Sequence, residues 1–213
     1  MRSLFFLLLA VGFLIGCSSC GNRVDEQIGR KLLFWDSMVD SVPQLVADSL
    51  RTVDPENLDR PGRAYYGLLK VISDDKTYVN FTSDSLINSV TDYYRSHDPK
   101  SSNYIRSLAY EGIVRTRMGI KDSTVYEPLR EAGRLLASMP DPSPSLGYMV
   151  SYFLGNINYN NRNYASADEY FRQTLDYARK EKDSVHLFDT YLAIYWNEMV
   201  QEKFGKGYSF KFL

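Results

Sequence analysis

The chain has 213 residues, 44% of them hydrophobic and 14% aromatic, and a formal net charge of −1. This much apolar surface can bury a core, which excludes a disordered chain, and the length suits one domain or one short solenoid. The charge is close to neutral and forms no basic stripe, so we expect no nucleic-acid partner.

The first residues are typical of a targeting segment. Arg2 supplies a positive charge, and an apolar run extends from Leu4 to Ile15. A membrane-spanning helix needs about 20 apolar residues. Because this run is shorter, it fits the hydrophobic region of a signal peptide better than a spanning helix. We therefore predict a signal peptide over residues 1–16.

The apolar run ends in Leu14-Ile15-Gly16-Cys17. This sequence resembles the bacterial lipobox, in which an aliphatic residue, a variable residue and glycine or alanine precede a cysteine. The resemblance implies diacylglycerol on the Cys17 sulfur, cleavage before Cys17 and acylation of the new amine, with residues 17–23 as a lipidated tether to the membrane. Two or more acyl chains give stable attachment where one does not. An uncleaved anchor, or ordinary signal-peptide cleavage beside a coincidental cysteine, are the alternatives.

The residues after Cys17 indicate the side of the cell envelope. Ser18 is not aspartate, which by the enterobacterial sorting rule disfavours retention in the inner membrane. The stretch from Ser18 to Arg23 holds no acidic residue, whereas surface-exported lipoproteins of Bacteroidetes tend to carry acidic residues there. We expect a lipid-anchored protein of the outer membrane that faces the periplasm.

Beyond the tether, almost every segment has apolar residues at helical spacing, and none alternates over a useful length. The first expected helix carries Val24, Ile28, Leu32 and Trp35 on one face. Cap residues and a proline in the first turn predict where the later helices start. These expected starts are at Asp40 or Ser41, Arg60-Pro61, Asp84, Ser101 or Ser102, Asp122 and Ser145.

Breakers predict where the helices end. They are Asp54-Pro55, Asp98-Pro99, Gly119 and the cluster from Met139 to Pro144. The expected helices come in pairs, with short turns within pairs and longer links between them. This pattern predicts an all-α fold, a stack of antiparallel helix hairpins forming an α-solenoid.

Residues 148–181 are the most informative part of the body. Small and aromatic residues recur there at the spacing of a tetratricopeptide repeat, which has about 34 residues. The matching residues are Leu154, Gly155, Asn163, Tyr164, Ala167 and Phe171. The segment therefore resembles one such repeat. It departs from the pattern at Asn158, where tyrosine is usual, and at Thr174, where a second alanine is usual.

The flanking repeats are degenerate. Residues 109–132 resemble a preceding repeat and residues 184–199 the first helix of a following one, so the last repeat is incomplete. The pattern of residues 84–94 also resembles the large group of tetratricopeptide lipoproteins of Bacteroidetes. This resemblance implies a right-handed superhelical stack over residues 24–213. It also implies a membrane-anchored scaffold that binds a protein or peptide partner.

In tetratricopeptide folds the first helices of each pair line a concave groove. The matched repeat places five residues there, Met149, Tyr152, Asn156, Tyr159 and Asn160, and the preceding repeat adds Arg106, Thr116 and Arg117. Asparagine and tyrosine can hydrogen-bond the backbone of an extended peptide while the rings pack its side chains. The alternative is that these residues only contact the next helix.

The sequence contains no familiar catalytic or metal-binding motif. Phosphate-binding glycine loops, nucleophile elbows and His-Glu-x-x-His are missing from the sequence. His97 and His186 are the only histidines, and Cys17 and Cys20 the only cysteines, so we expect no metal, no cofactor and no catalytic residue. A glycan- or nutrient-uptake accessory lipoprotein, or the shortened sensor domain of a tetratricopeptide regulator, are the alternative functions.

Overall fold

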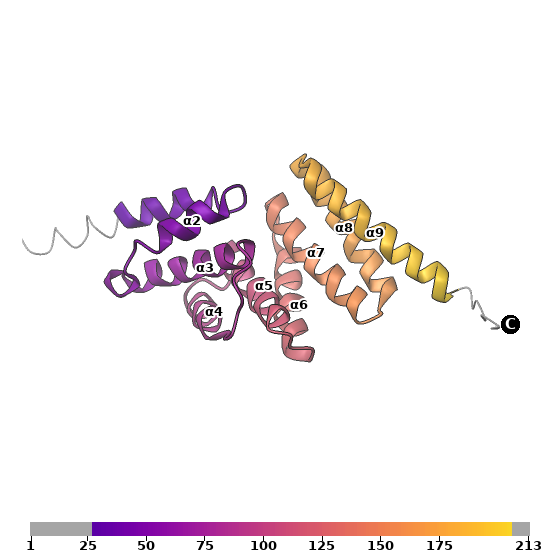
Figure 1. Ribbon diagram of the computed structural model, residues 1–213, viewed down its shortest axis with the longest axis horizontal. Coiled ribbons are helices and arrows are strands. Elements are labelled where there is room, and N and C mark those ends of the chain that lie inside the picture. The colour runs from indigo at the N-terminus through magenta and orange to yellow at the C-terminus, as the bar shows by residue number, and fades with distance from the viewer. Residues whose placement is uncertain (1–26, 206–213) are drawn as a thin grey trace, which may run out of the picture. The chain divides into compact units, whose positions relative to one another are not determined.

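The computed structural model of the chain describes residues 27–205, and every regular element within them is a helix (Figure 1). The prediction of an all-α fold is thus confirmed. The predicted signal peptide, Cys17 with its tether, and residues 206–213, where the incomplete last repeat would end, lie outside the described residues. Within residues 27–205, no helix combines the length and the apolar character that crossing a membrane requires.

The helices fall into two compact units, Met1–Asn80 and Phe81–Leu213, a boundary that the sequence patterns do not predict. The first unit contains a helix over residues 27–36 and three further elements. Its buried side chains are mainly aliphatic, since Leu50, Leu68 and Leu69 have no exposed surface. The three elements are α2 (Pro43–Leu50), the short 3₁₀ helix η1 (Pro55–Asn57) and α3 (Arg60–Lys76).

The start of α2 corrects one predicted cap. Its N-cap is Val42, which makes no side-chain cap bond, and neither Asp40 nor Ser41 takes that role. The reason is that Ser41 belongs to the preceding turn, where its N–H donates to the carbonyl of Met38 at 3.0 Å. Pro43 does occupy the first turn as predicted, because a proline there lacks only an N–H that would have no partner within the helix.

The second unit is a run of six helices in the described residues. Each helix from α4 to α9 packs on the next helix along the chain. In addition, α5 contacts α7, and α7 contacts α9. Contacts between alternate helices, together with contacts between neighbours, are what a stack of hairpins requires. The six are α4 (Ser85–His97), α5 (Ser102–Arg117), α6 (Ser123–Ser138), α7 (Pro144–Asn160), α8 (Tyr164–Glu181) and α9 (Ser184–Gly205).

Three predicted caps of this unit stand at the N-cap position and one is wrong. Asp84 is the N-cap of α4, although its side chain makes no cap bond. Ser101 Oγ accepts a hydrogen bond from the N–H of Tyr104, and an Asp122 carboxylate oxygen accepts one from Thr124. The start of α7 is capped by Ser143 rather than Ser145. Pro144 explains this shift, because its fixed φ and missing N–H suit the first helical position, which makes the residue before it the cap.

Small residues let α7 and α8 approach closely. A Cβ atom on Gly155 would lie 2.5 Å from Phe171 Cδ1, closer than two such atoms can pack. Phe171 and Ala167 are fully buried at this contact. The glycine and the aromatic of the matched repeat therefore meet in the core. Gly112 of α5 has the same relationship to Leu129 of α6.

The two departures from the repeat pattern are both buried and hydrogen-bonded. Asn158 Nδ2 donates to the carbonyl of Leu154 at 2.8 Å, and its Oδ1 accepts from Asn163 Nδ2 at 3.0 Å. Thr174 Oγ1 lies 3.0 Å from Ser151 Oγ, which links α8 to α7. Asn158 thus holds the turn between α7 and α8, a role that the repeat pattern does not reveal.

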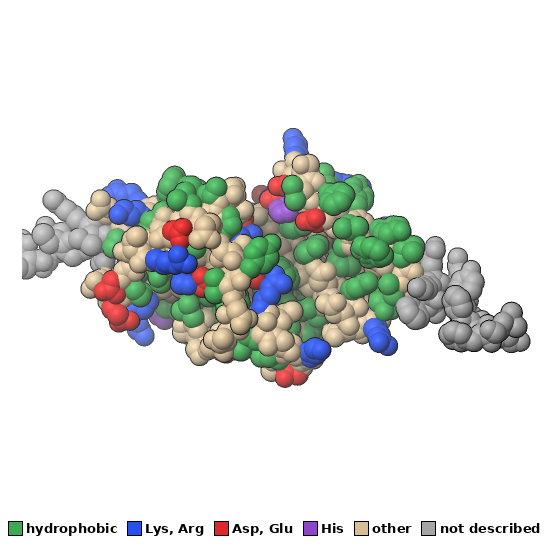
Figure 2. Space-filling view, viewed as in Figure 1, with side chains coloured by type: hydrophobic (Ala, Val, Ile, Leu, Met, Phe, Trp, Pro, Cys, Tyr) green, Lys and Arg blue, Asp and Glu red, His purple; other side chains and the backbone are tan. Residues whose placement is uncertain are grey.

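Helix α9 has apolar side chains on opposite faces. Its inner face packs on the core around Phe171 through Ile194, Leu187 and Ala193. Two polar residues are buried beside them, Thr190 and Asn197, and Asn197 Nδ2 donates to the carbonyl of Tyr164 at 3.0 Å. Its outer face is exposed, and Figure 2 shows hydrophobic side chains gathered over this end of the unit. The outer face is therefore an apolar surface without a partner helix among the described residues.

Candidate functional site

A hollow of about 210 Å³ lies between α7 and α9, and we call it the α7–α9 groove. Phe171 of α8 lies beneath it as part of the buried core. The residues on its two sides are Tyr152, Asn156 and Tyr159 from α7, and Asp189, Leu192, Ala193 and Trp196 from α9.

Three of the predicted groove residues line this hollow together. Tyr152, Asn156 and Tyr159 stand four and three residues apart on α7, so they share one face of that helix, and all three are partly buried. Met149 and Asn160 belong to the same helix but do not line the hollow, and the side chain of Asn160 is exposed.

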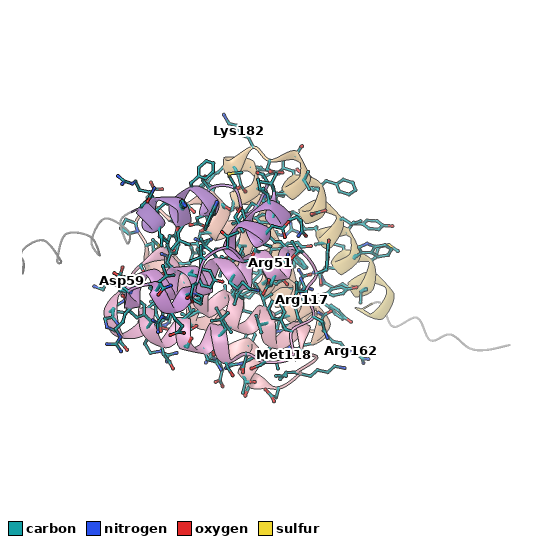
Figure 3. The ribbon with its side chains drawn as sticks, turned by 60° about the vertical axis from the view of Figure 1, so that its left-hand side comes forward. Arg51, Asp59, Arg117, Met118, Arg162 and Lys182 are labelled. Atoms are coloured by element: carbon teal, nitrogen blue, oxygen red, sulfur yellow. The ribbon has the colours of Figure 1, made fainter. Side chains whose placement is uncertain are left out.

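The three predicted residues of α5 do not line the groove either. Thr116 Oγ1 donates to the carbonyl of Gly112 at 2.8 Å, and Arg106 Nη1 donates to Asn103 Oδ1 at 3.4 Å. Both side chains are thus engaged within α5. Arg117 is the last residue of α5 and is exposed, as Figure 3 shows. The structure therefore concentrates the candidate site on α7 and α9, one hairpin further along the chain than predicted.

The sequence reasoning missed the α9 side of the groove. Asp189, Leu192, Ala193 and Trp196 recur at three- and four-residue spacing, so they lie on one face of α9. The signal was present, because residues 184–199 resemble the first helix of a following repeat. First helices line the groove in that family, so the same rule carried one repeat further would have selected this face.

An aromatic stack joins α7 to the start of α9 beside the groove. The His186 and Tyr148 rings are stacked with centroids 3.8 Å apart, and Tyr148 is stacked on Tyr152 at 5.5 Å. His186 Nδ1 also lies 2.9 Å from a carboxylate oxygen of Glu181. Burial raises the pKa of Tyr148 well above its usual value, so its hydroxyl stays neutral. The stack positions the ring of Tyr152 on the groove wall.

The groove combines apolar walls with a few polar groups. Leu192, Trp196 and Phe171 supply hydrophobic surface, while Asn156 offers both an amide donor and an acceptor, and Asp189 offers a carboxylate. Such a surface can hold a chain segment by apolar contact and fix its backbone with hydrogen bonds. Among the described residues, no three His, Cys, Asp or Glu side chains gather in a way that could hold a metal ion.

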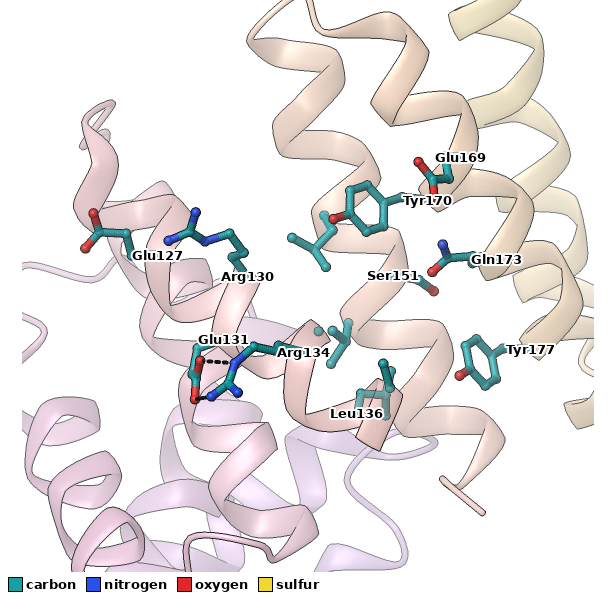
Figure 4. Close-up of a pocket in the computed structure, with 14 residues that line it drawn as sticks. Glu127, Arg130, Glu131, Arg134, Leu136, Ser151, Glu169, Tyr170, Gln173 and Tyr177 are labelled. Carbon is teal, nitrogen blue, oxygen red and sulfur yellow. Dashed lines mark hydrogen bonds and ion pairs between the residues drawn. The ribbon is translucent and has the colours of Figure 1, made fainter. Parts of the chain in front are cut away.

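A second hollow of about 570 Å³ lies between α6, α7 and α8 (Figure 4). Its rim carries charges of both signs, and Glu131 forms a salt bridge with Arg134 at 2.6 Å. That hydrogen bond lowers the pKa of Glu131, which keeps this carboxylate ionised rather than available as a general acid. The other charged residues on the rim are Glu127, Arg130 and Glu169.

None of the eight predicted groove residues lines this second hollow. Its floor includes Val150, Ser151 and Leu154, which are buried and belong to the packing between α7 and α8. The α7–α9 groove is therefore the candidate site, because there the predicted residues converge with aromatic and amide groups.

Comparison with known proteins gives no independent indication of a functional site. A scan against protein-family models finds no matching family, and searches of the curated proteins and of the solved structures find no significant match.

Proposed function

We propose that this chain is a lipid-anchored scaffold of the cell envelope that binds another protein or a peptide in the α7–α9 groove. The observation that carries the proposal is the convergence of Tyr152, Asn156 and Tyr159 of α7 on Leu192 and Trp196 of α9. Tyrosine and tryptophan dominate protein-binding surfaces because they combine a large apolar area with a hydrogen-bonding group.

The helix contacts support a tetratricopeptide-like arrangement. The contacts of α5 with α7, and of α7 with α9, fit a stack in which first helices neighbour one another. The close approach at Gly155 and Phe171 fits the small and aromatic positions of such a repeat. We extend this to a right-handed superhelical stack whose first helices line the binding side.

The chemistry of the groove suggests how a peptide would lie in it. The Asn156 amide can donate to a peptide carbonyl and accept from a peptide N–H, while Leu192 and Trp196 take up apolar side chains. Asp189 adds one carboxylate, which favours a peptide that carries Lys or Arg at that point. The proposed ligand is therefore an apolar peptide segment with a basic residue.

The anchor is proposed on the lipobox resemblance around Cys17. Cells fed a labelled palmitate should incorporate it into the wild-type chain and into a Cys20→Ser variant, but not into Cys17→Ser. The Cys17→Ser chain should also leave the membrane fraction. If the Cys17→Ser variant is labelled as strongly as wild type, the lipid is attached at another residue.

The binding proposal is tested by capturing the partner and then measuring its affinity. A tagged chain is crosslinked in intact cells, the captured polypeptide is identified, and its binding to the purified chain is measured by titration. Tyr152→Ala and Asn156→Ala should each weaken binding by about tenfold, as is typical when a central interface side chain is truncated. Asn160→Ala is the matched control, because Asn160 is exposed on the same helix outside the groove.

The control variant should bind within about twofold of wild type, since residues outside an interface contribute little. The far-UV circular dichroism of all three variants should match wild type, which shows that the fold is kept. Folded variants at 152 and 156 that bind as tightly as wild type would refute the groove.

A glycan-binding accessory role is the second candidate, and the exposed aromatic side chains of α9 favour it. Phe188, Tyr191, Tyr195 and Trp196 are each at least half exposed. Sugar rings stack best on a flat platform, and the Tyr195 and Trp196 ring planes are inclined by 65° to each other. Quenching of tryptophan fluorescence by soluble envelope glycans, abolished in Trp196→Ala, would support this second candidate over the first.

A further inference from the structure

The outer face of α9 carries a stripe of five apolar side chains. Phe188 is 66% exposed and Val185 is 63% exposed, values far above those of a core residue. In Figure 3, ring-bearing side chains project outward from the pale-yellow helix α9. We call this surface the α9 stripe, and its members are Val185, Phe188, Leu192, Trp196 and Met199.

An exposed apolar stripe of this kind is normally covered by a binding partner. A helix that is apolar on opposite faces is normally covered on both. Helix α9 packs its inner face on α8, and among residues 27–205 no other element covers the stripe. The largest contiguous apolar patch on a monomer is often a functional surface.

We propose that a second copy of this chain covers the stripe, with the two α9 helices antiparallel about a two-fold axis at Leu192. The stripe residues are separated by 3, 4, 4 and 3 positions, which reads the same in both directions. An antiparallel partner therefore presents Met199 to Val185, Trp196 to Phe188 and Leu192 to itself. A two-fold interface requires this self-matching of one surface, and an unrelated partner does not.

Tyr191 and Tyr195 flank the stripe, and each is 51% exposed. His186 and Ala193 face the other way, since the His186 ring stacks on Tyr148 of α7 and Ala193 packs on the core around Phe171. The two tyrosines therefore extend the apolar surface that a second copy can cover.

The exposed area is sufficient for a stable dimer. Large aromatic side chains bury roughly 150–250 Å² each, so the half-exposed stripe and its flanking tyrosines offer about 600 Å² per copy. Two copies would bury about 1,200 Å², the lower limit for specific interfaces.

The dimer and the groove can be tested separately. Leu192 and Trp196 take part in both surfaces, whereas Val185, Phe188 and Met199 belong to the stripe and do not line the α7–α9 groove. A second copy and a bound peptide would compete for Leu192 and Trp196. Substitutions at the other three positions should therefore abolish self-association and leave peptide binding intact or tighter. The dimer stands even if no peptide partner is found.

The first experiment is cysteine crosslinking in intact cells. The chain carries Cys20→Ser, to remove a competing thiol, together with Leu192→Cys. Mild oxidation should give a disulfide-linked species of twice the chain mass, because position 192 meets itself at the two-fold axis. Gln173→Cys, exposed on α8, is the matched control and should remain monomeric. Absence of the linked species from Leu192→Cys, or equal yields at both positions, would overturn the proposal.

The second experiment tests the direction of the helices. Two tagged copies, one with Val185→Cys and one with Met199→Cys, are co-expressed and oxidised. The antiparallel register predicts a mixed disulfide that carries both tags. Self-linked Val185→Cys in place of the mixed species would show parallel helices and contradict the two-fold axis at Leu192.

The third experiment measures mass. The full anchored chain in detergent should sediment as a dimer, and Phe188→Asp should sediment as a monomer with unchanged helicity, since Phe188 lies outside the core. A monomeric wild-type chain would overturn the proposal. If that monomer also binds vesicles or a glycan and Phe188→Asp does not, the stripe is the binding surface for that partner instead.

Discussion

The Arg115 guanidinium donates from Nε to an Asp84 carboxylate oxygen at 2.9 Å, joining α5 to the start of α4. The same group donates to Asn88 Oδ1 at 3.1 Å and to the carbonyl of Thr124 at 2.8 Å, and it pairs with Glu111 at 2.7 Å. The Arg115 side chain is only 15% exposed. One cation thus connects three consecutive helices of the second unit.

Arg115→Ala should destabilise the protein strongly. It leaves the buried carboxylate of Glu111 without its cation, and breaking such a pair typically costs about 3 kcal/mol. Urea unfolding followed by circular dichroism measures the loss. Arg134→Ala is the control, because the exposed pair of Arg134 with Glu131 should contribute less than about 1 kcal/mol. Equal losses in the two variants would contradict this account.

The stability that Asp84 contributes should depend on pH. The hydrogen bond from Arg115 lowers the pKa of Asp84 below its ordinary value of 3.8. A lowered pKa in the folded state means that the contribution is fully present above the unfolded value and is lost as pH falls through the folded value.

The matching measurement compares wild type with Asp84→Asn between pH 7 and pH 2. Wild type should be the more stable at neutral pH, and the difference should shrink as pH falls below about 4, since the unfolded carboxyl then takes up its proton. Other carboxylates cancel in the comparison. A difference that stays constant over this range would show that the Asp84 charge does not act as described.

Gly155→Ala should destabilise the helix pair α7–α8. The added Cβ would lie 2.5 Å from the Phe171 ring, and overpacking of this kind typically costs about 1–3 kcal/mol. Gly29→Ala is the control, because nothing lies within 4 Å of a Cβ there. It should be neutral or stabilise by up to about 1 kcal/mol through helix propensity. Phe171→Leu added to Gly155→Ala should recover part of the loss in thermal unfolding.

Asn158→Ala should destabilise the turn between α7 and α8. The variant loses the bonds to Leu154 and to Asn163, and a hydrogen bond of this kind typically contributes about 0.5–1.5 kcal/mol. Asn160→Ala, exposed two residues later, should change the free energy of unfolding by less than about 0.5 kcal/mol. If the two variants unfold alike in urea, Asn158 has no role in holding the turn.

Local sequence signals predict much of the fold. Ser101 and Asp122 identify helix starts because a cap depends on one side chain and the N–H two or three residues later. The same logic fails at Ser145, because Pro144 moves the start of the helix back. No local signal marks the boundary after Asn80, which depends on which helices pack together and not on composition.

The sequence predicts only those residues of the candidate site that share one face of a single helix. Tyr152, Asn156 and Tyr159 share a face by the period of α7, so a single matched repeat is sufficient to group them. Whether Arg106 lies in the same groove depends on how α5 packs against α7. The spacing of residues along one helix does not determine that packing. Trp196 could have been selected by applying the first-helix rule to residues 184–199, but its approach to Tyr152 depends on how α9 packs on α8.

The most direct test of the central claim places a photocrosslinking amino acid at position 156, in the α7–α9 groove, and at position 160, exposed on the same helix outside the groove. Irradiation of intact cells should give an adduct with one defined polypeptide from position 156 and none from position 160. Adducts of equal yield from both positions, or none from position 156, would contradict the claim that this groove holds another polypeptide.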